Sequence, residues 1–151
     1  MELENRINAD IKAAMIARES QKLEALRGIK AALLLAKTSK EAVAGEITEE
    51  AGLKILQKLV KQRQESAEIY KNNGRNDLAE QELFQAAVIE VYLPKQLSEE
   101  QIREGLMKII RETGASSVKD IGKVMGLASK EFAGKADNKV IADLVKILLG
   151  S

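Results

Sequence analysis

Apolar residues recur every three or four positions along most of the chain, and no segment alternates convincingly with a period of two. The first spacing is typical of an amphipathic helix, whereas the second would indicate a strand. The opening stretch carries one such face, formed by Leu3, Ile7, Ile11 and Ala14. In this half of the chain, helices are predicted over residues 2–18, 20–37, 49–72 and 76–91. In the fourth, the residues expected to be buried are Leu78, Leu83, Ala86, Ala87 and Val91.

Residues that start and stop helices divide this pattern. Ser20 and Thr48 are expected to cap the second and third helices, because a hydroxyl can accept from an unpaired amide of the first turn. Pro94, the only proline, disfavours helix at the residue before it. We therefore expect a domain boundary here, with residues 1–92 forming a helical hairpin within a four-helix region.

Three further helices are predicted after the proline. Ser98 and Gln101 have the spacing of a capping box, which starts a helix running to about residue 112. Ser117, with Asp120 three positions on, is expected to start the next helix, which Gly134 ends, and Asp137 is expected to cap the last. The expected fold class is all-α, with a C-terminal three-helix module over residues 95–151.

Composition excludes several kinds of chemistry. The 151 residues include no Cys and no His, which removes disulfides, thiol nucleophiles, imidazole catalysis and His- or Cys-based zinc sites. We expect no catalytic residue, no metal and no cofactor. The chain has no apolar run of the roughly 20 residues that a membrane span needs and no basic leader. We therefore expect a cytoplasmic protein that is not associated with a membrane.

Charge is nearly balanced, with 24 basic and 23 acidic residues, so any binding to nucleic acid must come from a local patch. Residues 1–94 hold 14 basic and 15 acidic side chains, and residues 95–151 hold ten and eight. The C-terminal module is therefore mildly basic. Its lysines gather between residues 119 and 139.

The most unusual local feature is a pair of glycines, Gly122 and Gly126, inside a predicted helix. Each costs roughly 1 kcal/mol relative to Ala, so the pair indicates that something approaches the helix backbone closely. A neighbouring helix is the favoured interpretation, and a nucleic-acid backbone or another partner is the alternative.

Other motifs have simpler explanations. A phosphate-binding loop around Gly134 and Lys135 fails, because Ser129 stands where its first glycine belongs and Ala136 where its Ser or Thr belongs. Ser116 and Ser117 are interpreted as capping residues. A strip of basic residues on the third helix is interpreted as a solvated face rather than a second phosphate-binding surface: Lys54, Lys58, Lys61 and Arg63.

Three stretches together resemble the YqeY-like proteins of the GatB/YqeY family. They are residues 90–100, residues 114–117 together with the two-glycine motif at 122–126, and residues 134–137. The resemblance covers essentially the whole chain and implies an all-helical fold in two parts. Residues 95–151 are also similar to the tail domain of the B subunit of the tRNA-dependent amidotransferase.

The resemblance implies contact with tRNA and does not imply catalysis, so a label of carbon–nitrogen ligase with glutamine as amide donor would be inherited through the tail. The residues that carry over are Gly122, Lys123, Gly126, Gly134 and Lys135. Asn138 departs from the pattern, since many relatives have Gly there. With the nearby lysines, the candidate RNA-binding residues are Gly122, Lys123, Gly126, Lys130, Gly134, Lys135 and Lys139.

Three functions are therefore weighed. The first is a non-catalytic tRNA-binding accessory protein, acting alone or beside an amidotransferase or tRNA synthetase. The second is a helical protein–protein interaction module, and the third is an amidotransferase-type enzyme, which the missing nucleophile, base and metal ligands oppose.

Overall fold

The computed structural model describes residues 2–40 and 42–150, which form seven α-helices and one turn of 3₁₀ helix. The elements are α1 (Glu2–Ala17), α2 (Ser20–Lys37), α3 (Glu49–Asn72), α4 (Asn76–Glu90), α5 (Glu99–Thr113), η1 (Val118–Asp120), α6 (Ile121–Glu131) and α7 (Asn138–Leu148). No strand forms within the described ranges, so the expected all-α class is confirmed. None of the described helices is both long and apolar enough to span a bilayer.

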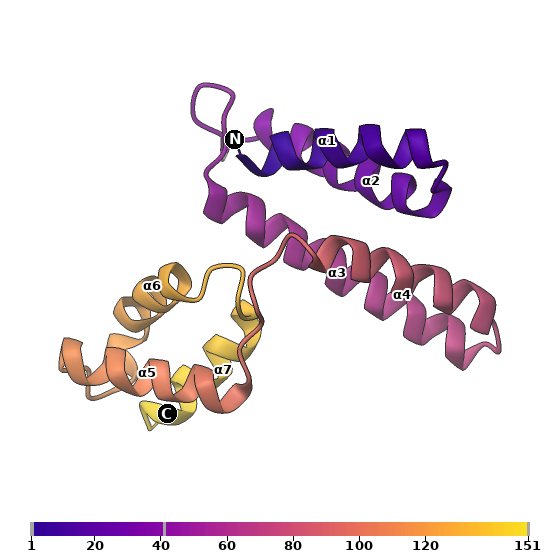
Figure 1. Ribbon diagram of the computed structural model, residues 1–151. Helices are drawn as coiled ribbons and strands as arrows, with labels where there is room; N and C mark the ends of the chain where they lie inside the picture. Colours follow the sequence, from indigo (N-terminus) through magenta and orange to yellow (C-terminus); the bar gives the residue numbers. More distant parts are fainter. Residues whose placement is uncertain (1, 41, 151) are drawn as a thin grey trace. The chain divides into compact units, whose positions relative to one another are not determined.

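The chain divides into two compact units, Met1–Leu93 and Pro94–Ser151. In the first, α1 lies beside α2 and α3 beside α4, and α4 also packs on α2 (Figure 1). In the second, α5, α6 and α7 pack on one another around a separate core. The fully buried side chains of that core include Leu106, Val124, Ile141 and Val145. The cores of the two units are separate, and we predict that each unit folds on its own.

Several helix ends form as their sequences predict. Thr48 accepts from the amide of Ala51 at 3.0 Å. Ser98 and Gln101 form both bonds of a capping box. Asp137 accepts from the amide of Lys139 at 3.0 Å. These bonds satisfy amides that a helix leaves unpaired at its start.

Two helices, α2 and α6, do not begin in the way that their sequences predict. Ser20 is the first residue of α2 rather than its cap, and Glu19 stands in the cap position without a side-chain bond to the helix. Ser117 caps the short η1 through the amide of Lys119, and α6 itself begins only at Ile121. Here the carboxylate of Asp120 accepts from the amide of Ser116. The two polar residues thus build a tight turn in front of the helix.

The buried face of α4 differs from the expected one. Ala86 is buried, but Leu83, Ala87 and Val91 are exposed, Val91 at 70%. Apolar residues lie on all sides of this helix, so their spacing does not select a face. Contacts with α2 and α3 decide which side is buried.

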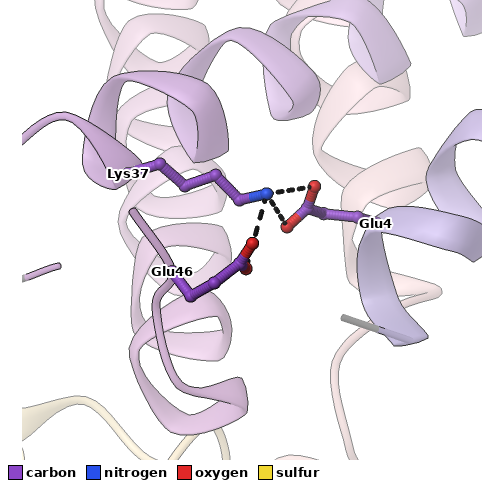
Figure 2. A network of polar contacts seen from close by, with 3 residues as sticks. All are labelled: Glu4, Lys37 and Glu46. Atoms are coloured by element: carbon purple, nitrogen blue, oxygen red, sulfur yellow. Dashed lines mark hydrogen bonds and ion pairs between the residues drawn. The ribbon is translucent and has the colours of Figure 1, made fainter. Parts of the chain in front are cut away.

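A charged cluster joins the two ends of the first helical pair (Figure 2). The ammonium of Lys37, in the last turn of α2, lies 2.7 Å from each carboxylate oxygen of Glu4 in α1. It also lies 3.6 Å from a carboxylate oxygen of Glu46, in the segment before α3. The hydrogen bond to Glu4 is the main reason that the pKa of Lys37 is raised. The cluster therefore links three segments of the first unit.

A second polar contact fixes the end of the same unit. The hydroxyl of Tyr92, which is buried, donates to the carboxylate of Asp10 in α1. The guanidinium of Arg6 lies over the Tyr92 ring, 5.1 Å from its centroid. Burial, followed by the bond to Asp10, raises the pKa of Tyr92 above its ordinary value of 10.0.

This pKa shift predicts a loss of stability in alkali. As the pH rises past 10, the unfolded chain loses the Tyr92 proton before the folded chain does, so the stabilisation is complete below pH 10 and decreases above it. Tyr92→Phe is expected to cost about 1 kcal/mol at neutral pH and to make stability fall less steeply above pH 10. Urea unfolding over a pH series measures both effects. The control is Tyr70→Phe, and equal behaviour of the two variants would contradict the assignment.

Candidate functional site

The orientation of α6 depends on a contact between Phe132, at its C-terminal end, and Gly105 of α5. A Cβ added to Gly105 would lie 2.4 Å from a ring carbon of Phe132, closer than two carbon atoms can approach. Phe132 is buried there, 5% exposed. Gly105 is not among the residues predicted from the sequence, although it lies within the apolar stripe of Ile102, Leu106 and Ile109. A glycine in such a stripe signals that a neighbouring side chain needs its space.

This contact turns one face of α6 inward and leaves the other open. Val124 and Ala128 are buried against the core of the second unit. The exposed face carries Gly122, Lys123, Gly126 and Lys130. Nothing lies within 4 Å of a Cβ added to either glycine. The favoured interpretation of the sequence, that these glycines seat a neighbouring helix, is therefore wrong within the described part of the second unit.

The turn after α6 places the remaining candidates. Gly134 has a φ of 75°, which favours glycine, and it is buried, so its part is to shape the turn rather than to face solvent. The amide of Lys135 donates to the carbonyl of Phe132 at 2.9 Å, and the Lys135 side chain is exposed. Lys139 is exposed in the first turn of α7. The structure thus brings four candidates onto one helix face and two lysines onto the segment that follows.

The four candidate lysines of α6, the turn after it and the start of α7 are available to bind an external anion. Among the described residues, no ion pair is formed by Lys123, Lys130, Lys135 or Lys139. Two nearby acidic side chains, Asp120 and Asp137, accept from backbone amides. Lys123 and Lys130 are seven residues apart, about 10 Å along the axis, with Gly126 between them.

The basic strip on α3 is different. Lys54 lies 3.5 Å from the carboxylate of Glu50. Arg63 points into the first unit, where its guanidinium approaches Gly28 and donates to Gln85 and to the carbonyl of Leu59. At least Lys54 and Arg63 are therefore occupied within the chain. This placement fits a solvated helix face better than a second phosphate-binding surface.

The described residues offer little else for chemistry. Ser116 and Ser117 take part in the turn before α6, through the Ser116 amide and the Ser117 hydroxyl. No group of three acidic side chains that could hold a metal ion occurs within the described ranges. The open, lysine-bearing face of α6 is therefore the candidate site.

Nearly the whole chain matches one protein family. The family model described as Yqey-like protein matches residues 4–149. The match spans both units and all seven helices, so the chain belongs to the YqeY-like family.

Two curated relatives are similar over much of the chain. One is "Altered inheritance of mitochondria protein 41, mitochondrial" of Pyrenophora tritici-repentis, 28% identical over 97% of this chain and 80% of the relative. A protein of the same name from Clavispora lusitaniae is 32% identical over 73% of this chain and 64% of that relative. Both are mitochondrial by name, which contradicts the cytoplasmic location expected from the sequence. Hydropathy and composition do not decide between compartments, and the names of these two relatives point to mitochondria.

The different surroundings of the glycines predict opposite effects on stability. Gly126→Ala is expected to stabilise the second unit by about 1 kcal/mol, since Ala favours helix and meets open space. Gly105→Ala is expected to destabilise it by roughly 1–3 kcal/mol, because the methyl group displaces Phe132. Urea unfolding followed by helical circular dichroism measures both. A loss of stability in Gly126→Ala would mean that α6 has a neighbour on its open face.

Proposed function

We propose that this protein is a non-catalytic RNA-binding accessory protein, that its RNA is tRNA, and that it acts alone or beside an amidotransferase or a tRNA synthetase. The observation that carries the proposal is the open face of α6. Gly122 and Gly126 lie uncovered there, beside lysines that form no ion pair among the described residues.

Two properties of this face suit a phosphate backbone. Lysine ammonium groups bind phosphates and release the counterions condensed on the nucleic acid, which gives affinity without base recognition. The glycines remove the side chains that would hold a bulky sugar–phosphate backbone away from the helix. Each glycine costs about 1 kcal/mol of helix stability, and no contact within the described chain offsets it.

The choice of tRNA rests on the resemblance of residues 95–151 to the tail of the amidotransferase B subunit. The absence of Cys and His from the sequence supports a role without catalysis, because the common acid–base and nucleophilic groups are missing. A carbon–nitrogen ligase label would then describe the family of the tail rather than a reaction of this chain.

The first experiment is a gel-shift titration of the full chain with total tRNA over a salt series. If Lys123, Lys130, Lys135 and Lys139 each contact one phosphate, affinity should fall about 50- to 150-fold between about 50 and about 200 mM salt. The double change Lys123→Glu, Lys135→Glu should flatten the logarithmic salt slope by roughly 1.4 to 1.8.

The matched control reverses two exposed lysines of α5 and α7, Lys108→Glu and Lys146→Glu. It makes the same change in net charge within the same unit, so it should leave the slope nearly unchanged. Equal effects of the two double variants would indicate a general charge effect. Unchanged affinity and slope in the folded test variant would contradict the proposal and favour a protein-interaction module.

The second experiment separates binding from stability with Gly126→Ala. The added methyl group should stabilise the helix and yet weaken tRNA binding, because it holds the phosphate backbone away. We expect a loss of affinity of about fivefold or more, read in the same titration, together with a higher urea midpoint. A more stable variant with native affinity would show that close approach to α6 is not part of binding.

A further inference from the structure

The segment that leads into the second unit lies against the turn that carries Lys135. The side-chain amide of Gln96 donates to the carbonyl of Gly134 at 2.6 Å and to that of Pro94 at 3.0 Å. One residue on, the amide of Leu97 donates to the carbonyl of Lys135 at 2.9 Å. We call these two bonds across to the turn, from Gln96 and Leu97, the latch.

The latch completes the fixing of the Lys135 backbone. Its amide already donates to Phe132, which is buried against Gly105, and its carbonyl accepts from Leu97. Both polar groups of the Lys135 backbone are therefore bonded to parts of the chain that are themselves held. Leu97 packs on the core of the second unit, and Ser98 directly after it caps α5.

The Lys135 side chain, in contrast, is exposed and makes no ion pair among the described residues. A lysine has a long flexible stem, so fixing its backbone removes part of the freedom that binding would otherwise have to remove. Gln96 itself is exposed, and its amide bonds backbone carbonyls rather than core atoms. Its contribution is therefore separable from folding.

We propose that Gln96 is a positioning residue for phosphate binding: through the latch it holds the Gly134–Lys135 turn, so that the Lys135 ammonium meets an RNA phosphate from a fixed backbone. This inference rests on the proposed function and assigns a part to a residue outside the open face of α6. Gln96 itself touches no RNA.

The first test needs no RNA. Gln96→Met keeps the length of the side chain and removes its donor, so the turn should open more often. Trypsin cleavage after Lys135, identified by fragment mass, should rise about fivefold relative to cleavage after Arg75, in the exposed turn between α3 and α4. Gln81→Met, the same change on an exposed residue of α4, should leave the ratio unchanged. An unchanged ratio in Gln96→Met would overturn the latch.

The second test is a double-mutant cycle in tRNA affinity with the full chain. Gln96→Met should weaken binding about fivefold in the native background and have no effect in a Lys135→Met background, because it acts through Lys135. A merely structural role would weaken binding equally in both backgrounds and would overturn the inference.

The outcomes separate this inference from the proposed function. If the native chain binds tRNA and Lys135→Met weakens binding while Gln96→Met does not, only the positioning role fails. If Lys135→Met leaves binding unchanged, the positioning role also fails, and binding through α6 stands. If the native chain shows no salt-dependent binding of tRNA, both proposals fail together.

Discussion

The contact between Phe132 and Gly105 is the constraint on which the candidate site depends. The aromatic ring occupies the space of a missing side chain, so α6 can approach α5 only with Phe132 turned inward. Once that end is fixed, the helical period places Val124 and Ala128 in the core. The period also places Gly122 and Gly126 outward, where nothing in the described chain covers them. The carbonyl of the same Phe132 holds the amide of Lys135, so one packing contact arranges both the helix face and the turn.

The first unit relies on polar contacts at its edges as well as on its apolar core. Lys37 joins α1, α2 and the segment before α3, and it does so where loops replace helix packing. Tyr92 ties the last turn of the unit back to Asp10, close to the point where Pro94 ends helical structure. The pKa of Lys37 is raised chiefly by its hydrogen bond to Glu4, and that of Tyr92 by burial and then by its bond to Asp10, so both groups contribute less stability in alkali. The unit is thus closed at the loops by groups whose charge state is stable at neutral pH.

Helical periodicity was sufficient to predict the fold class, because most helices here have one clearly apolar side. It was insufficient for α4 and the residue that follows it, since Leu83 and Val91 lie exposed although they are as apolar as buried Ile89. A helix with apolar residues all round takes its orientation from its neighbours, and neighbours are not part of the local pattern. Capping residues were more reliable. Ser98 and Asp137 act as predicted because capping involves only nearby backbone.

The helical glycines also show what a local sequence pattern leaves undecided, and which further feature of the sequence decides it. Glycine in a helix indicates close approach, but the residue alone does not say what approaches. Position relative to the apolar stripe does: Gly105 lies inside such a stripe, whereas Gly122 and Gly126 lie beside the one that contains Val124 and Ala128. The hydrogen bond from Gln96 to the carbonyl of Gly134 had no comparable signal, because it joins residues 38 positions apart through a backbone carbonyl.

The side chains around Gly122 and Gly126 indicate which kind of partner fits the exposed face of α6. A groove or face that receives a protein helix needs apolar anchors at helical spacing. On α6 the large apolar side chain left exposed is Leu127, at 45%, while Lys123 and Lys130 flank Gly126. Burying two unpaired ammonium groups against an apolar partner would cost far more than one leucine contributes. A phosphate backbone reverses this balance, because it supplies counter-charges to the lysines and needs the space that the glycines leave. The arrangement of charge around small residues therefore favours an anionic polymer over a helical protein partner.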